Sequence, residues 1–411
     1  MSDLVLTDLS QVVTNDPAHG SRLGIVTDPA IAIVDGTIAW VGKRGELPGD
    51  FQAMPSVAFE GRSAVPGFVD SHTHLVFGGD RAGEFGERLA GRAYEEILAS
   101  GGGIEATVAA TVAAATADLL EATRARAATM LAAGTTTVEI KSGYALDGPG
   151  EERLLEIAGA VMEQLPLDVA STYLVHTVPR QWPGGRDAYV EDVVGDILPR
   201  CAPLARFCDV FCDEGVFTVA ETRRIVEAAK SHGLVPRLHA CQLASSGGAG
   251  LAAEVGAASA DHLDHVTGDE LAAMEKAGTV AVLLPGVSFS MRLPQPDARR
   301  IAAAGVTIAI ATDANPGTSY VLTMPFVIAL ATLEMGMSPD DALWSATRGG
   351  ALALRERSKG WLRPGAAADI VVLDAPSHVH LAYRPDSPLV HAVLKDGVTV
   401  AAPTPLPESF G

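Results

Sequence analysis

Short apolar segments alternate with longer helical patterns along the middle of this chain, and that alternation limits the folds open to it. Eight segments have the composition of buried strands, and helical patterns such as 103–133, 151–164, 218–231 and 269–277 separate most of them. Apolar strands that lead into helices are typical of parallel βα units, and eight units favour a closed (β/α)8 barrel. The expected strands span 67–74, 135–142, 169–176, 207–213, 235–240, 258–265, 279–284 and 307–313.

An open, doubly wound sheet is the alternative arrangement of the same units. A dinucleotide-binding sheet of that kind carries Gly-x-Gly-x-x-Gly after its first strand, and this chain does not. The run Gly101-Gly102-Gly103 lacks the Lys-Ser/Thr of a phosphate-binding loop and is interpreted as a flexible turn. The sequence therefore predicts an α/β protein with a TIM-like barrel.

Both ends of the chain have the pattern of β structure. Near the start, Asp35-Gly36 separates the apolar runs 30–34 and 37–42, and Asp-Gly between two such runs is a strong hairpin signal. Near the end, 368–374 and 391–400 have a similar composition, so we expect the two ends to pack together. The expected domains are a small β-sandwich of residues 1–65 plus 365–411 and a barrel of residues 66–364.

The formal net charge of −20 excludes some partners and constrains any substrate. Nucleic-acid binding draws on clustered Lys and Arg, so a nucleic-acid partner is not expected. The overall charge would not attract an anionic substrate from a distance, and such a substrate would need a cation inside its pocket.

Other features favour a cytoplasmic protein without a membrane partner. Residues 1–4 lack the basic and apolar regions of a signal peptide, and no uninterrupted apolar run is long enough to cross a bilayer. The four cysteines form no Cys-x-x-Cys pair, so we expect buried thiols in a reducing compartment. They are Cys201, Cys208, Cys212 and Cys241.

Polar residues gather where the expected strands end. In a (β/α)8 barrel the carboxyl ends of all strands meet at one rim, which carries the active site. A lone His at a strand end is more often structural than functional. The joint pattern favours a site, because a structural barrel gains little from collecting costly polar groups at one rim. The rim residues are His72, His74, Lys141, Tyr144, His176, His239, Gln242, His262, His265, Asp313 and Asn315.

Four of these residues form a candidate metal site. His72 and His74 lie two apart in the first expected strand, so their side chains are expected to point at one spot. With His239 and Asp313 they provide three imidazoles and one carboxylate, which suit zinc or iron better than magnesium or calcium. Zinc in such a site lowers the pKa of a bound water to roughly 7.

The remaining roles follow from that water. Asp313 could accept its proton, and His262 could polarise a substrate carbonyl or stabilise an oxyanion. A second His-x-His, at 378–380, is not followed by further candidate ligands at strand ends and is interpreted as an exposed turn.

The residues around these positions resemble the metal-dependent amidohydrolase superfamily and, within it, the imidazolonepropionase family of histidine degradation. The superfamily's strand-one signature, Pro-Gly-Phe-Val-Asp-Ser-His-Thr-His, spans 66–74. The narrower resemblance rests on segments that cover nearly the whole barrel. They are 74–81, 88–91 with 101–104, 141–144, 176–179, 259–263 and 311–318.

The resemblance implies a reaction, a cofactor and a set of site residues. The reaction is hydrolysis of the cyclic amide of 4-imidazolone-5-propanoate to N-formimidoyl-L-glutamate by a metal-activated water. One Zn²⁺ or Fe³⁺ ion per subunit is expected, and the subunits are expected to form a homodimer. The implied metal ligands are His72, His74, His239 and Asp313, and Asp313 and His262 are the implied catalytic residues. Arg81 is placed to pair with the propionate, and the other implied substrate contacts are Tyr144, His176, Gln242, Asn315, Gly317 and Thr318.

The chain departs from the family pattern at several positions. Ala145 stands where Gly is usual, and Leu174-Val175-His176-Thr177 replaces Gly-Ala-His-Ala. Gln242 occupies a position that is Glu in some members, and an amide cannot act as a general base. Lys141 lies where some amidohydrolases carry a carboxylated lysine between two metals, a role that the expected single metal disfavours.

Two other functions also fit the sequence. A related hydrolase or deaminase that acts on a hydantoin, a dihydropyrimidine or a purine would use the same scaffold. A barrel that has lost catalysis would serve as a binding or assembly protein, but all four ligand candidates and His262 are present.

Overall fold

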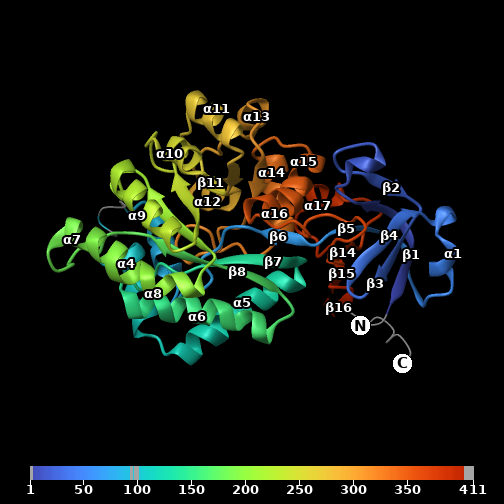
Figure 1. Ribbon diagram of the computed structural model, residues 1–411, viewed down its shortest axis with the longest axis horizontal. Helices are drawn as coiled ribbons and strands as arrows, with labels where there is room; N and C mark the ends of the chain where they lie inside the picture. Colours follow the sequence, from blue (N-terminus) through green and yellow to red (C-terminus); the bar gives the residue numbers. More distant parts are fainter. Residues whose placement is uncertain (1–2, 93–95, 97–100, 402–411) are drawn as a thin grey trace.

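The computed structural model describes residues 3–92, 96 and 101–401, which form two sheets and their surrounding helices (Figure 1). One sheet has eight parallel strands, and each strand pairs with the next one in sequence. This order confirms the predicted (β/α)8 barrel. The strands are β6 (Phe68–Asp70), β7 (Thr135–Lys141), β8 (Asp168–Val175), β9 (Phe207–Cys212), β10 (Val235–Ala240), β11 (Ser259–His262), β12 (Val280–Leu283) and β13 (Ile308–Ile310).

The barrel closes through the segments that follow its first and last strands. The amide of Asp313 donates to the carbonyl of His72, and the amide of His74 donates to the carbonyl of Ala314, each at 3.0 Å. The expected strand over 67–74 is therefore too long, because β6 ends at Asp70 and the His-x-His belongs to the closing segment. An isolated parallel bridge between Thr73 and Ala314 keeps that segment extended.

One expected helix is divided in two. The pattern over 103–133 forms α4 (Ile104–Ala113) and α5 (Thr116–Ala132), separated by Ala114 in an extended conformation (φ −72°, ψ 143°). Arg153 donates to the carbonyls of Thr111 and Ala114, at 3.0 and 3.2 Å, and so satisfies the end of α4.

The remaining helices include the three others that were expected, over 151–164, 218–231 and 269–277, and none of the helices in the described ranges is both long and apolar enough to span a bilayer. They are α1 (Gly49–Gln52), α2 (Ala82–Leu89), α6 (Gly148–Gln164), α7 (Gly185–Asp192), α8 (Leu198–Cys201), α9 (Val219–Ser231), α10 (Gly248–Val255), α11 (Gly268–Ala277), α12 (Pro285–Met291), α13 (Ala298–Ala303), α14 (Met324–Leu333), α15 (Pro339–Trp344), α16 (Gly350–Ala353) and α17 (His380–Tyr383).

The two chain ends share a second sheet, on the right of Figure 1. Asp35 and Gly36 have φ values of 48° and 74°, and Asp396 and Gly397 have 48° and 75°. Two left-handed residues in succession suit the tight hairpin turn that Asp-Gly predicts. The strand order is β16-β15-β14-β5-β1-β3-β4, with β2 on β1, and the bounds are β1 (Leu4–Val13), β2 (Ile25–Thr27), β3 (Pro29–Val34), β4 (Thr37–Lys43), β5 (Ser56–Pro66), β14 (Ile370–Leu373), β15 (Val390–Lys395) and β16 (Val398–Ala401).

A small domain built from both ends is thus confirmed, and we retain its division from the barrel at residues 65/66 and 364/365 as a proposal. The four cysteines are buried free thiols, as expected. The interpretation of 378–380 as an exposed turn is only partly correct, because the segment turns and Val379 is exposed but His378 is not. His378 is buried, with Nε2 2.8 Å from Asp340 Oδ1 and Nδ1 3.0 Å from Gln11 Nε2, so this histidine joins the chain-end sheet to α15.

Charged side chains also join the chain-end sheet to the barrel. Lys359 Nζ lies 2.6 Å from Asp168 Oδ2, at the start of β8, and 2.8 Å from Asp369 Oδ2, just before β14. Lys395 Nζ, at the end of β15, lies 3.2 Å from a carboxylate oxygen of each of the same two aspartates. The Lys359, Lys395 and Asp369 side chains are largely buried, so their charges depend on one another.

Replacement of Asp369 by Asn should therefore lower the free energy of unfolding by about 2 kcal/mol, because two mostly buried ammonium groups lose a shared carboxylate. Denaturant unfolding of both proteins measures this difference. Asp396→Asn is the matched control, because the Asp396 side chain is 48% exposed and contacts the same lysines. Equal stability losses in the two variants would contradict the role assigned to burial.

Candidate metal centre and substrate pocket

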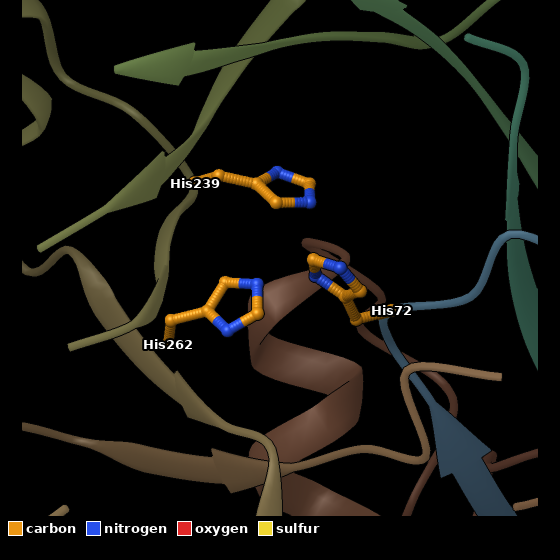
Figure 2. A group of neighbouring side chains, drawn as sticks. All are labelled: His72, His239 and His262. Carbon is orange, nitrogen blue, oxygen red and sulfur yellow. The ribbon is translucent and has the colours of Figure 1, made fainter. Parts of the chain in front are cut away.

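Three histidines from separate parts of the barrel point toward one another at its carboxyl rim (Figure 2). His72 follows β6, His239 lies in β10 and His262 ends β11. The ring centroids of His72 and His239 are 4.5 Å apart, and those of His239 and His262 are 5.2 Å apart. One nitrogen from each ring lies within 4.8 Å of the other two.

His74 and Asp313 complete this centre on the other side of His72. His72 Nε2 and His74 Nε2 are 3.3 Å apart, and Asp313 Oδ1 lies 3.4 and 3.2 Å from them. Asp313 Oδ1 is buried and has no hydrogen-bond partner in the described chain. Two imidazole nitrogens and an orphaned carboxylate oxygen at these separations fit a metal ion with bonds of about 2.0–2.2 Å. His239 is the fourth predicted donor, with its ring centroid 5.5 Å from that of His74.

Buried carboxylates contact the far nitrogens of two of these rings. Asp261 Oδ2 lies 2.6 Å from His72 Nδ1, and Asp209 Oδ2 lies 3.0 Å from His239 Nδ1. A carboxylate on Nδ1 fixes the orientation of an imidazole and directs its Nε2 lone pair toward a metal. The amide of His239 also donates to Asp209 Oδ1 at 3.0 Å, so backbone and ring are held together.

Two buried cations balance these carboxylates. Lys141 Nζ lies 2.7 Å from Glu139 Oε1 and 2.8 Å from Asp209 Oδ2, and Arg237 Nη2 lies 3.0 Å from Asp261 Oδ2. All five side chains are inaccessible to solvent. Burial lowers the pKa of Lys141, but Asp209 and Glu139 outweigh it and raise the pKa above its usual value.

The neighbouring histidines differ in their electrostatics. Burial lowers the pKa of His74 to about 4. Burial and Lys141 also lower the pKa of His72, but Asp261 and Asp313 outweigh them and raise it to about 9. His176 and His262 have pKa values well below the usual range because of burial, so both rings are neutral at neutral pH.

A cavity of about 470 Å³ opens above this centre. Ligand cavities of this size hold small metabolites. His74, His239 and Asp313 line it, whereas His72 is fully buried beside them. Every predicted catalytic and substrate-binding residue lines the same cavity: Arg81, Tyr144, His176, Gln242, His262, Asp313, Asn315, Gly317 and Thr318.

The loops that carry these residues are held by buried acidic side chains. Glu151 of α6 accepts hydrogen bonds from the amides of Gly143, Ala145 and Leu146, on either side of Tyr144. Asp213, just after β9, accepts from the amide of Gln242 at 2.7 Å and from the two amides that follow. Sequence reasoning missed both residues, because an acidic residue on a neighbouring βα unit carries no motif.

Two of the rim residues have left-handed backbones. His262 has φ 78° and Asp313 has φ 49°. Non-glycine residues in sparsely populated backbone regions cost about 1–3 kcal/mol each and persist where the surroundings fix them. Here the amide of Asp313 is fixed by the closing hydrogen bond to His72.

The cavity also contains charged residues to which the sequence assigned no role: Glu84, Asp264 and Arg88, the last of which belongs to the family segment 88–91. Burial raises the pKa of Asp264 to about 6. Glu84 and Arg88 lie three and seven positions after Arg81, and this helical spacing could have revealed them. Lys141 and His265, which the sequence placed at the rim, are not among the described residues that line the cavity.

Comparisons with known proteins agree with this geometry. Residues 63–400 match the amidohydrolase family. An imidazolonepropionase from Salinispora arenicola is 49% identical over 98% of this chain and 100% of its own length. The imidazolonepropionase of Streptomyces coelicolor is 47% identical over 97% of this chain and 99% of its own, and that of Haloarcula marismortui is 44% identical over 98% and 97%.

Solved structures agree on the fold. An adenosine deaminase from Xanthomonas campestris with bound zinc superposes with a TM-score of 0.72, at 20% identity, over 100% of this chain and 95% of its own. An atrazine chlorohydrolase from Arthrobacter aurescens, complexed with zinc, gives 0.69 at 18% identity over 97% and 95%. The sequence matches, which span nearly the whole chain, place this protein in the amidohydrolase family and, within it, among the imidazolonepropionases.

Proposed function

We propose that this enzyme hydrolyses the ring amide of 4-imidazolone-5-propanoate to N-formimidoyl-L-glutamate, a step of histidine degradation. The family supports this reaction. The structural observation that carries it is the lining of one cavity. Imidazole and carboxylate donors and the Arg81 guanidinium all line it. This arrangement suits a substrate with a hydrolysable ring and an anionic arm.

We propose His72, His74, His239 and Asp313 as the ligands of one zinc or ferric ion per subunit. Such an ion polarises a carbonyl and makes hydroxide available near neutral pH. The Lys141 ammonium, already bonded to two carboxylates, is poorly suited to carry a carboxylate between two metals. This supports a single ion.

The residues of the chain then divide the remaining work. The Asp313 carboxylate accepts the proton of the attacking water and returns it to the leaving ring nitrogen. The His262 imidazole, neutral because it is buried, donates a hydrogen bond to the developing oxyanion. Gln242 lines the cavity, but an amide cannot act as a general base. Its role is to orient the substrate by hydrogen bonding.

The propionate binds at the part of the cavity wall that contains Arg81. Arg81 supplies a guanidinium for the carboxylate. Asn315 holds its own loop: its Oδ1 accepts from the amides of Gly317 and Thr318, each at 2.8 Å. Tyr144 and His176, whose ring centroids are 5.3 Å apart, form part of the cavity wall and are proposed to contact the ring.

We also propose a cytoplasmic homodimer that uses neither nucleic acid nor a membrane. The buried free thiols and the net charge of −20 support the compartment and the lack of a nucleic-acid partner. The homodimer rests on the family resemblance alone, and sedimentation of the purified protein measures it.

Turnover of imidazolone propionate should be lost on chelation and should return when zinc or ferric iron is restored. Loss of ring absorbance measures the rate, and elemental analysis of the same samples measures the metal. A panel of neutral cyclic amides is the specificity control. Full activity without metal, or equal turnover across the neutral rings, would contradict the proposed function.

Arg81→Ala should raise KM for imidazolone propionate at least tenfold while the metal content stays at the wild-type level, because a charge-assisted contact is worth about 1.5–3 kcal/mol. Steady-state kinetics and elemental analysis measure the two quantities. Arg124→Ala, which removes an exposed arginine paired with Glu121 on α5, is the control. An unchanged KM in the Arg81 variant would exclude it as a carboxylate contact.

Asp209→Asn should weaken metal retention by about 10- to 100-fold, because the His239 ring loses its carboxylate partner. Lys141 keeps Glu139 as a counter-ion, so the variant should fold. Competition against a chromogenic chelator measures retention. Asp213→Asn is the matched control, because Asp213 accepts loop amides, and its retention should be unaltered. Wild-type retention in the Asp209 variant would refute the orienting role.

A further inference from the structure

The face that α2 turns toward the cavity is entirely charged. Arg81 caps the helix, and Arg81, Glu84 and Arg88 are partly buried while the residues between them are exposed. Positions i, i+3 and i+7 share one face of a helix. All three side chains line the cavity, and α2 contains no fully buried residue. The charged face therefore contains the least exposed side chains of this helix.

The Glu84 carboxylate forms an ion pair with the Arg81 guanidinium. Arg81 Nε donates to Glu84 Oε2 at 2.9 Å, and Arg81 Nη2 pairs with Glu84 Oε1. Glu84 Oε2 also accepts from the amide of Gly103 at 2.9 Å, so the pair is anchored to the segment before α4. Arg81 Nη1 also lies where a Cβ at position 317 would be, so any other residue at 317 would displace the guanidinium from this position. Arg81 is oriented, but its charge is largely neutralised.

Arg88 differs because, among the described residues, its hydrogen bonds go to neutral acceptors. Its Nη1 lies 2.9 Å from Met291 Sδ, and its Nη2 lies 3.4 Å from the carbonyl of Ser290, both on α12. Within residues 3–92, 96 and 101–401 it forms no ion pair. A thioether is a weak acceptor, and a guanidinium has five donors, so most of its hydrogen-bonding capacity remains. A charged group in a cavity without a counter-ion attracts an anion.

One bound carboxylate would balance the net charge of this face. Two guanidinium groups and one carboxylate leave a single net positive charge. We propose that Arg81, Glu84 and Arg88 form one carboxylate-binding unit, in which Glu84 orients Arg81 and Arg88 supplies the uncompensated charge. Arg88 is then a specificity-determining residue for substrates with an anionic arm. This inference rests on the proposed function for the identity of the substrate.

The unit also explains how a chain of net charge −20 admits an anion. An anionic substrate of so acidic a protein needs a cation inside the pocket, and the arginines on this part of the cavity wall provide it. If Arg88 only linked α2 to α12, its loss would affect all ligands equally. If it balances a carboxylate, its loss would affect only ligands that carry one.

A binding experiment separates these roles without relying on turnover. The probes are imidazole-4-propanoate, which has the propionate arm but no ring amide to hydrolyse, and its neutral primary amide. Calorimetry on the metal-loaded protein gives Kd for each. Arg88→Gln should weaken binding of the acid about tenfold and change binding of the amide less than twofold. Arg88→Lys should restore most of the loss, because it keeps the charge.

Arg92→Gln is the matched control. It removes the same charge four residues later from an arginine that pairs with Glu87 and does not line the cavity. Its affinities should equal those of the wild type. The proposal is overturned if Arg88→Gln weakens acid and amide in parallel, if it weakens neither, or if the wild-type protein does not prefer the acid.

Turnover then separates this proposal from the proposed function. If the wild-type enzyme prefers the acid probe but does not hydrolyse imidazolone propionate, the reaction is wrong and the carboxylate-binding unit stands. If it hydrolyses that substrate and Arg88→Gln leaves KM unchanged, the reaction stands and the role of Arg88 fails. Both the reaction and the role of Arg88 are supported if Arg88→Gln raises KM about tenfold and keeps kcat within about threefold of the wild type.

Discussion

The hydrogen bonds that close the barrel also bring the candidate metal ligands together. The amide of Asp313 donates to His72, and the amide of His74 donates to Ala314, so the segments after β6 and β13 are joined residue by residue. Asp70 strengthens the same junction, because its carboxylate accepts from the amide and the hydroxyl of Thr312. Ligands from the first and last strands are therefore placed by closure of the barrel, and the left-handed backbone of Asp313 is held in the same way.

Closure alone does not orient the imidazoles. That depends on the buried charges behind them, where Asp261 contacts His72 and Asp209 contacts His239. Buried carboxylates are costly unless they are paired, and Lys141 and Arg237 provide the pairing. The barrel interior thus holds buried charges of both signs. Burying them costs free energy, but it fixes the orientation of the imidazole rings before a metal binds.

The sequence predicted the parts of this structure that have local signals. Short apolar runs and Asp-Gly turns act within a few residues, and the barrel and hairpins follow from them. Where the sequence failed, a distant contact decided the outcome. Arg153 stabilises the end of α4, and His378 is held by contacts with Asp340 and Gln11. None of these contacts can be read from a local pattern.

In the candidate site, too, residues within motifs could be predicted from the sequence and the residues that support them could not. The His-x-His and the residues of the family motifs were found from sequence, and the structure places most of the predicted site residues around one cavity, with His72 buried beside it. The residues that support them were not found, because Glu151, Asp209 and Asp213 are ordinary acidic residues until the fold places them behind a loop or a ring.

Anomalous diffraction from crystals of the purified protein, recorded at the zinc and iron edges, would show directly whether one metal ion lies among the four candidate ligands. We expect one strong peak per chain, about 2.0–2.2 Å from the Nε2 atoms of His72, His74 and His239 and from Asp313 Oδ1. A metal-loaded, active preparation with no peak among these four side chains would contradict this assignment.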